Sequence, residues 1–225
     1  MFTTTLLTAP GKAALDPSLV EALRGAWGGT TARWLAPDEA AEFDMPSVPD
    51  TRWSSWDELQ ALGVDLIVQP TEGRRKKMLL ADMDSTMIQQ ECIDELADEA
   101  SVGARVKDIT ARAMNGESDF AGALRERVGL LKGLPVATID KVIAERIQLM
   151  PGGPELIATM KANGAWCVLV SGGFTDFTDR IAEKIGFQET RANRLLKANG
   201  KLTGEVAMDR SRATPTALFD LTQDD

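Results

Sequence analysis

The sequence predicts an α/β protein with a mainly parallel sheet, preceded by a small α+β domain. Two short apolar segments, residues 78–83 and 166–170, are typical of buried strands, and several helical segments lie between and after them. Strands that alternate with helices indicate a parallel sheet covered by helices. Residues 1–70 differ, because four of the five tryptophans lie there among short elements broken by Pro and Gly.

Composition limits the chemistry that this chain can perform. It has 225 residues, no His, two Cys and a net charge of −9, from 25 basic and 34 acidic residues. The absence of His excludes Ser-His-Asp and Cys-His nucleophile systems within the chain, and also a His-ligated zinc site. Acid–base work therefore falls to Asp, Glu, Lys or Cys. The acidic balance argues against broad binding to nucleic acid or to anionic membranes.

The cysteines and the N-terminus indicate a compartment. Cys92 and Cys167 lack CxxC spacing and are too few for a disulfide scaffold, so we expect free thiols in a reducing environment. The N-terminus has no basic residue ahead of its short apolar stretch, which makes a poor signal peptide. The apolar run around Cys167 is too short to span a membrane. We expect a soluble cytoplasmic protein; the oligomeric state stays open.

Residues 1–70 form the predicted N-terminal domain, for which we find no catalytic signature. Asp16 and either Ser54 or Ser55 are the expected N-caps. A Gly and four consecutive basic residues then predict a solvated linker at 71–77, with a functional basic patch as the less favoured alternative. The expected elements are a strand at 3–7, helices at 17–26, 37–43 and 56–62, and a strand at 64–68.

The second domain spans residues 78–225. Four helices between its first two strands, at about 88–150, are too long for a simple crossover and predict an inserted helical cap. Gly164 is placed to end the helix that precedes the second strand. The expected elements after residue 83 are helices at 89–100, 102–114, 119–131, 138–148 and 153–163, a strand at 166–170, a helix to 185 and a strand at 189–195.

Two acids, Asp82 and Asp84, follow the first apolar strand directly. Ligands of open α/β sheets bind outside the carboxyl ends of strands, and side chains two positions apart in extended backbone point the same way. Two neighbouring carboxylates repel each other unless a cation neutralises them, and Mg²⁺ prefers such oxygen ligands. Asp82 is then a candidate nucleophile that forms an aspartyl-phosphate, with Asp84 as acid and base. The alternative is that these residues only end a strand and cap a helix.

Ser171-Gly-Gly-Phe174 follows the second apolar strand and is expected to open a helix. A hydroxyl and free backbone N–H groups at a helix N-terminus can bind a phosphate, and glycines permit its close approach. The alternative is an ordinary strand-to-helix turn with Ser171 as the N-cap. The two motifs together, on two strand ends, are more specific than either alone.

Together, Asp82-Met-Asp-Ser-Thr86 and Ser171-Gly-Gly-Phe174 resemble the haloacid dehalogenase (HAD) superfamily of phosphatases, and within it the phosphoserine phosphatase family. The resemblance covers about residues 77–204 and implies a Rossmann-like parallel sheet with an inserted helical cap. Further matching stretches are Glu91-Cys-Ile-Asp-Glu95, Met114-Asn-Gly-Glu117, Asp119-Phe-Ala-Gly-Ala-Leu-Arg-Glu-Arg127-Val, Leu130-Leu-Lys-Gly-Leu-Pro135, and Ala192-Asn-Arg-Leu195 with Gly200-Lys-Leu-Thr-Gly204.

The resemblance implies Mg²⁺-dependent hydrolysis of O-phosphoserine, as in serine biosynthesis. It makes Asp82 the nucleophile and a Mg²⁺ ligand, and Asp84 the general acid/base with its backbone carbonyl on the metal. An Arg fork suits a carboxylate, and an apolar lid excludes water. The resemblance also implies that Glu91 binds the substrate ammonium group and that Arg127 binds the substrate carboxylate. Ser171 and Gly172 would bind the phosphate, and Met114 and Phe120 would form an apolar cap wall. Without the resemblance, Glu91 and Arg127 would be interpreted as solvated helix residues, and Met114 and Phe120 as core residues.

The sequence departs from the family pattern after residue 204. The family carries a later Lys and a Gly-Asp-Gly-x-Asn-Asp motif, whereas the last Lys here is Lys201. Arg210 and Arg212 are not clearly in register with the Lys, and the later acids lack the glycine context. We therefore expect a C-terminally incomplete sheet whose first strand becomes an exposed edge. Two alternatives follow: a non-catalytic binding or regulatory protein, and a phosphatase for another small phosphomonoester. A partner that supplies the strand is less favoured.

Overall fold

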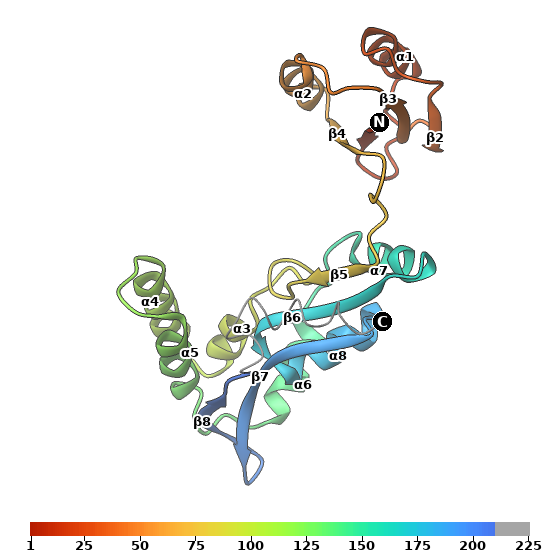
Figure 1. The fold of residues 1–225 in the computed structure, drawn as a ribbon. Coiled ribbons are helices and arrows are strands. Elements are labelled where there is room, and N and C mark those ends of the chain that lie inside the picture. The colour runs from red at the N-terminus through yellow and green to blue at the C-terminus, as the bar shows by residue number, and fades with distance from the viewer. Residues whose placement is uncertain (210–225) are drawn as a thin grey trace. The chain divides into compact units, whose positions relative to one another are not determined.

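The computed structural model describes residues 1–209, so Arg210, Arg212 and the acids at 220, 224 and 225 lie outside the described part. The chain divides into two compact units, one of them Met1–Lys76 and the other beginning at Lys77 (Figure 1). Across residues 1–209, no helix combines the length and apolar character needed to cross a membrane. The cytoplasmic location stays a prediction.

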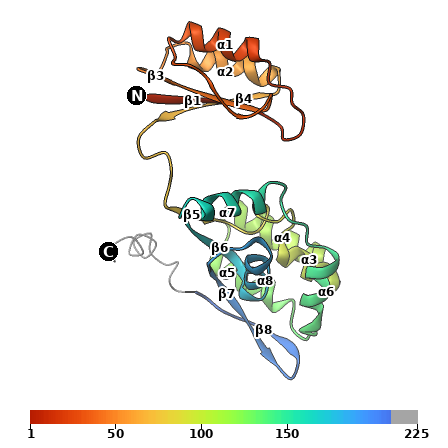
Figure 2. The same cartoon turned by 90° about the vertical axis from the view of Figure 1, so that its right-hand side faces the viewer.

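The first unit is a four-stranded antiparallel sheet in the order β2-β3-β1-β4. Both of its helices cover the same face of this sheet (Figure 2). This β-α-β-β-α-β arrangement is the ferredoxin-like split βαβ motif. Its elements are β1 (Phe2–Thr8), α1 (Pro17–Ala26), β2 (Arg33–Ala36), β3 (Ala40–Met45), α2 (Arg52–Ala61) and β4 (Val64–Pro70).

Two local predictions for this unit are wrong. The helix expected at 37–43 is a turn at 37–39 followed by the strand β3, whose alternate residues Ala41, Phe43 and Met45 point into the core under the helices. Neither Ser54 nor Ser55 is an N-cap, since α2 begins at Arg52 and both serines lie inside it. Asp16 is confirmed as the N-cap of α1; its Oδ1 accepts a hydrogen bond from the Ser18 N–H at 2.7 Å.

The second unit contains a four-stranded sheet in the order β5-β6-β7-β8. The first three strands are parallel and β8 is antiparallel, which confirms the predicted α/β class with a mainly parallel sheet. Its strands are β5 (Met78–Ala81), β6 (Trp166–Phe174), β7 (Glu189–Ala198) and β8 (Lys201–Ala207). Its helices are α3 (Cys92–Glu99), α4 (Gly103–Met114), α5 (Phe120–Gly129), α6 (Ala137–Glu145), α7 (Gly153–Ala162) and α8 (Thr175–Ile185).

The two ends of this sheet differ from each other. Within the described residues, β5 lies at one edge, where Leu80 is 43% exposed. At the other edge lies β8, a strand that was not expected from the sequence. A tight turn produces it, because Asn199 and Gly200 both adopt left-handed conformations, with φ of 52° and 73°. Such pairs match the twist of hairpin strands.

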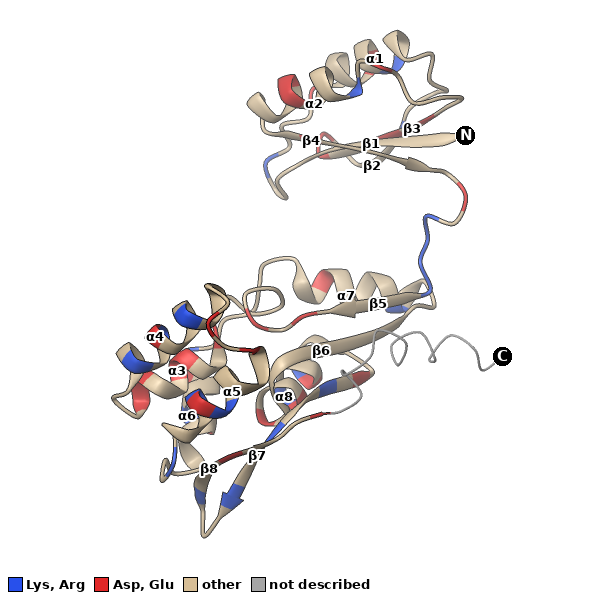
Figure 3. Ribbon diagram, turned by 60° about the vertical axis from the view of Figure 1, so that its left-hand side comes forward, with Lys and Arg blue, Asp and Glu red and all other residues tan. Residues whose placement is uncertain are grey.

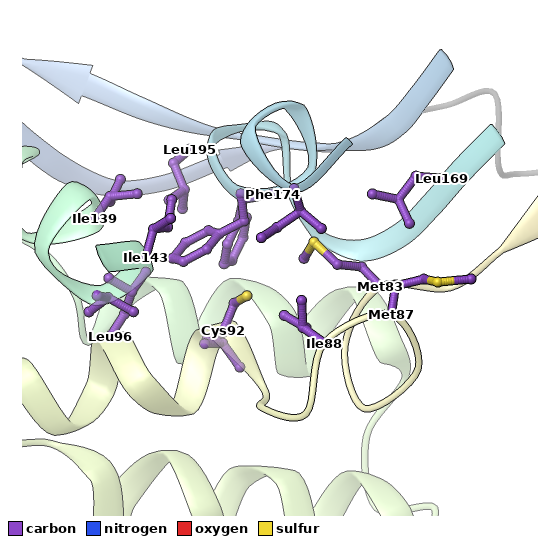
Figure 4. Close-up of a cluster of buried hydrophobic side chains, with 14 of the residues drawn as sticks. Met83, Met87, Ile88, Cys92, Leu96, Ile139, Ile143, Leu169, Phe174 and Leu195 are labelled. Carbon is purple, nitrogen blue, oxygen red and sulfur yellow. The ribbon is translucent and has the colours of Figure 1, made fainter. Parts of the chain in front are cut away.

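The helices of the predicted cap share one hydrophobic core with the sheet. Side chains of α3 and α6, among them Leu96 and Ile143, pack toward Phe174 of β6 and Leu195 of β7 (Figure 4). The helices α4 and α5 pack on each other, and α4 also packs on α3. The inserted region thus shares the core of the sheet through α3 and α6, and it also contacts β8 directly through α5 and through backbone hydrogen bonds of the segment at 133–136.

The chain enters and leaves this region through adjacent segments. Ile88 and Leu149 form an antiparallel bridge. Beside it, the Gln89 N–H donates to the carbonyl of Gln148, and the Met150 N–H donates to that of Met87, both at 2.9 Å. These bonds fix the start and the end of the insertion against each other.

Candidate active site

A pocket of about 200 Å³ lies at the carboxyl ends of β5 and β6. Six of the eight residues predicted for the site line it, whereas a larger open hollow of about 550 Å³ along α8 and β7 contains none of them. Acidic residues lie along the segment that follows β5 (Figure 3). The lining residues are Asp82, Asp84, Glu91, Ile93, Phe120, Leu124, Arg127, Gly172, Gly173 and Phe174.

Asp82 and Asp84 flank a buried anchor, Met83, just after β5 ends. The Met83 side chain is fully buried, and its carbonyl accepts the N–H groups of Met87 and Ile88 at 2.9 and 3.0 Å. This tight turn holds both carboxylates at the end of the strand. One oxygen of Asp82 accepts a hydrogen bond from the Met83 N–H at 2.8 Å.

The Asp84 carboxylate is fixed by two different elements. Its Oδ1 accepts a 2.8 Å hydrogen bond from the N–H of Cys92, the first residue of α3. Its Oδ2 accepts a 3.1 Å bond from the Ser171 hydroxyl on β6. A carboxylate at a helix N-terminus is stabilised by the helix dipole and by unpaired backbone N–H groups. The structure therefore brings the two predicted motifs into direct contact.

The segment after residue 170 departs from the prediction. The expected helix opening at Ser171 is wrong, because β6 continues to Phe174 and α8 begins at Thr175. The register with β7 shifts between Val170 and Phe174, which pair with Arg191 and Asn193. The strand thus bulges at residues 171–173. Bulges commonly re-aim residues beside active sites.

The bulge leaves little room for a side chain at Gly173. A Cβ atom on Gly173 would lie 3.0 Å from the Ser171 hydroxyl oxygen and 3.1 Å from Asp84 Oδ2. The Gly173 N–H donates to the same Ser171 oxygen at 2.8 Å. Ser171 is fully buried and joins the bulge to the acidic pair.

Glu91 lies on the cap side of the pocket, immediately before α3. It accepts a 2.7 Å hydrogen bond from the hydroxyl of Ser85, whose φ of 53° is unusual for a residue with a side chain. Burial is the largest cause that raises the pKa of Glu91 above its ordinary value, and the nearby charges of Asp84, Asp94 and Asp82 raise it further. The Ser85 hydrogen bond acts in the opposite direction.

Arg127 projects from α5 into the same pocket. Among residues 1–209, its guanidinium makes only long hydrogen bonds, 3.4 Å to the Thr110 hydroxyl and 3.4 Å to the Ala123 carbonyl. Burial lowers the pKa of Arg127, while the charges of Asp94 and Glu91 oppose that change. An arginine guanidinium is not deprotonated in proteins, so the side chain stays charged. Most of its donor capacity is available to a ligand.

The apolar wall of the pocket differs from the prediction in its members. Phe120 lines the pocket and is 55% exposed, whereas Met114 is 84% exposed at the end of α4 and is not among the lining residues. Ile93 and Leu124 were not singled out from the sequence, although each lies within three positions of Glu91 or Arg127. Gly173 and Phe174 belong to the predicted motif but were given no role.

The metal-binding capacity of the described residues is limited. Within residues 1–209, no group of three or more His, Cys, Asp or Glu side chains is arranged to hold an ion. Both Asp84 oxygens already accept hydrogen bonds, so the available donors are the Asp82 carboxylate and backbone carbonyls. Mg²⁺ usually keeps several waters and takes one or two carboxylates plus substrate phosphate. The oxygen donors present fit a hydrated Mg²⁺ ion.

The strand-end acids and the bulged glycine segment match a known sequence pattern. The sequence model of the haloacid dehalogenase-like hydrolases matches residues 79–217, more than half of the chain. The chain belongs to this family. The match covers the pocket and the sheet of the second unit, so the HAD-like fold predicted from the sequence is confirmed.

Known HAD-like proteins similar to this chain are phosphoserine phosphatases. One from Archaeoglobus fulgidus is 46% identical over 66% of this chain and 44% of its own length. A solved substrate-bound phosphoserine phosphatase complex is 44% identical over 59% of this chain and 63% of its own, with a TM-score of 0.56. An unliganded probable phosphoserine phosphatase from Vibrio cholerae is 29% identical, covers 99% and 68%, and has a TM-score of 0.72. The chain spans about half the length of the curated relatives it matches.

Proposed function

We propose that this HAD-like protein hydrolyses O-phospho-L-serine to L-serine and phosphate, in the cytoplasm and within serine biosynthesis. The observation that carries the proposal is the single pocket that combines the Asp82–Asp84 pair with Glu91 and Arg127. The first pair suits phosphoryl transfer, and the second matches the two charges of an amino acid. The similarity to phosphoserine phosphatases supports the same substrate.

Substrate recognition follows from charge and geometry. The Arg127 guanidinium suits bidentate binding of the substrate carboxylate, and Glu91 suits its ammonium group. The N–H groups of Gly172 and Gly173, which line the pocket, would bind the phosphoryl oxygens, whereas Ser171 is fully buried outside the lining and would hold Asp84 and the Gly173 N–H in place. The apolar side chains of Phe120 and Leu124 would exclude water, which strengthens the electrostatic interactions inside the pocket.

The reaction takes two displacement steps. A carboxylate oxygen of Asp82 attacks phosphorus, the bond to the serine Oγ breaks, and that oxygen leaves with the electron pair and a proton from Asp84. Water then attacks the aspartyl-phosphate and gives a proton to Asp84. The phosphorus–oxygen bond to Asp82 breaks, which releases phosphate and restores both carboxyl groups. A bound Mg²⁺, held by the Asp82 carboxylate and the Asp84 backbone carbonyl, would neutralise phosphoryl charge.

The test is phosphate release from O-phospho-L-serine by the 225-residue chain and its Asp82→Asn variant. We expect Mg²⁺-dependent turnover that falls by more than about 10³-fold in the variant, because the nucleophile is lost. A chelator should stop the reaction, and returning Mg²⁺ should restore it. Absence of turnover in folded wild-type protein would rule out the proposed activity for this chain.

A second candidate is a binding protein that retains the pocket but does not turn over substrate. One observation favours it: both oxygens of the Asp84 carboxylate, the proposed acid and base, already accept hydrogen bonds from Cys92 and Ser171. Calorimetry with O-phospho-L-serine separates the two candidates. Binding without phosphate release would support this second function, and failure to bind would exclude both.

A further inference from the structure

Asn193 is a buried polar residue on β7 that contacts the bulge at residues 171–173 without lining the pocket. Only 1% of it is exposed. Its Nδ2 donates a 2.7 Å hydrogen bond to the carbonyl of Gly172, and its Oδ1 accepts a 3.0 Å bond from the Asp209 N–H. Because one partner is an acceptor and the other a donor, these two bonds define the orientation of the side-chain amide.

The position of Asn193 in the sheet explains why a side chain makes this contact. Val170 pairs with Arg191 and Phe174 with Asn193, so β6 uses four positions where β7 uses two. The regular ladder between the strands is interrupted at the bulge. A buried carbonyl without a partner is costly, and the Asn193 amide supplies the donor that Gly172 needs.

The Gly172 carbonyl and the Gly173 N–H belong to one peptide group. The described chain has no cis peptide bonds, so these two groups point in opposite directions. When Asn193 holds the carbonyl on the β7 side, the N–H is directed away from β7 and toward Ser171, to which it donates at 2.8 Å. The orientation of one peptide plane thus couples Asn193 to the pocket.

We propose that Asn193 is a positioning residue that locks the 172–173 peptide so that the Gly173 N–H faces the Ser171 hydroxyl and the phosphoryl group. This inference rests on the proposed function for the identity of the ligand. The peptide orientation itself can be measured without any ligand. Asn193 also ties the bulge to Asp209, so the backbone that follows β8 reaches the pocket through the same amide.

The test uses Asn193→Asp, which keeps the size and the acceptor for the Asp209 N–H but replaces the donor to Gly172. The matched control is Thr178→Val on α8, because Thr178 is fully buried and its hydroxyl has no hydrogen-bond partner in the described chain. We expect hydrogen exchange of the Gly173 amide, followed by NMR, to become about 10-fold faster in the first variant only. Inorganic phosphate, titrated with Mg²⁺ present, should bind about 10-fold more weakly.

If Asn193→Asp does not fold, Asn193→Ser removes the long donor without adding a charge, and the same two measurements apply. Unchanged Gly173 exchange in a folded variant would overturn the proposal, whatever its turnover. Faster exchange in a protein whose wild type does not bind phosphate would support the positioning role and count against the proposed function. The failures of the two ideas are therefore distinguishable.

Discussion

Asp84 and Arg127 lie in the same pocket but are held differently. Asp84 accepts hydrogen bonds of 2.8 and 3.1 Å from a helix N-terminus and from a buried serine. Arg127 projects from α5 and, within the described part of the chain, makes only 3.4 Å hydrogen bonds. We call the Asp82–Asp84 side of the pocket the reacting end and the Glu91–Arg127 side the recognition end. Short hydrogen bonds at two strand ends hold Asp84 at the reacting end, whereas Arg127 reaches the recognition end as a long side chain on a helix. Substrate preference can change on α5 without disturbing the acidic pair.

The reacting end should be the more sensitive of the two. Asp84→Asn keeps the shape of the side chain but cannot exchange the proton, so we expect the kcat for O-phospho-L-serine to fall by about 10²–10⁴-fold. The KM should change little, because Asp84 does not bind the amino-acid charges. The control is Asp108→Asn, an exposed residue of α4 that pairs with Arg112. Steady-state kinetics measure both constants, and an unchanged kcat would show that Asp84 is not the acid and base of the reaction.

The recognition end should respond in a substrate-specific way. Arg127→Ala should lower kcat/KM for O-phospho-L-serine by about 10–100-fold, the value of hydrogen bonds to a charged group. Phenyl phosphate, which lacks the carboxylate, should be affected by less than about twofold. Arg125→Ala, an exposed neighbour on α5, is the control. Equal losses with both substrates would contradict the carboxylate role and favour another phosphomonoester as substrate.

Glu91 gives the recognition end a pH dependence. Its pKa is raised, chiefly by burial, and it must be ionised to bind an ammonium group. The KM for O-phospho-L-serine should therefore increase as the pH falls through that raised pKa, at a higher pH than an ordinary Glu would show. Glu91→Gln should raise the KM at every pH and remove this dependence. A wild-type KM that does not vary across that range would contradict the ammonium role.

The same raised pKa has a consequence for stability. A carboxyl group with a raised folded-state pKa contributes stability at pH values below its unfolded pKa and loses it as the pH rises through the folded value. Ionised Glu91 thus opposes folding at neutral pH. Thermal unfolding should show Glu91→Gln to be slightly more stable than wild type at pH 7, and a difference that disappears at acidic pH.

The smallest effects are expected where the apolar wall meets solvent. Phe120→Ala should raise the KM several-fold, about 3- to 5-fold, because a pocket-lining ring is lost. Met114→Ala should leave the KM within about twofold and the free energy of unfolding within about 0.5 kcal/mol, since the side chain is mostly exposed. Matched kinetics and denaturation compare the two. A larger effect from Met114 would place it in the wall that the sequence predicted.

Local sequence signals predicted the acidic pair at the reacting end more fully than the bulge and the buried Asn193 that lie behind it. Asp82 and Asp84 follow an apolar strand, so their position depends on the adjacent residues alone. The bulge at 171–173 depends on the register between β6 and β7, which no short segment encodes. Asn193 belongs to the matching stretch Ala192-Asn-Arg-Leu195, but its role was not predicted, because that role exists only when two distant strands lie side by side.

The errors in the first unit have a similar origin. The segment at 37–43 has helix-forming residues, yet pairing with β1 and burial of Phe43 make it part of a strand. The strands at 3–7 and 64–68, whose residues favour strands, were predicted within two positions of their ends. Local preference succeeded where tertiary contacts agree with it.

The paired segments around Ile88 and Leu149 have a further consequence. Gln89 and Leu149 are 60 positions apart in sequence, yet the side-chain amide of Gln89 donates a hydrogen bond to the Leu149 carbonyl at 3.4 Å. The insertion therefore begins and ends at neighbouring positions beside β5, and it meets the sheet a second time at β8, through backbone hydrogen bonds of the segment at 133–136. We expect that lengthening or shortening the α4–α5 hairpin leaves the distance between Ile88 and Leu149 unchanged. Under the proposed function, changes in the α4–α5 hairpin should alter substrate recognition at Arg127 more than they alter the positions of Asp82 and Asp84.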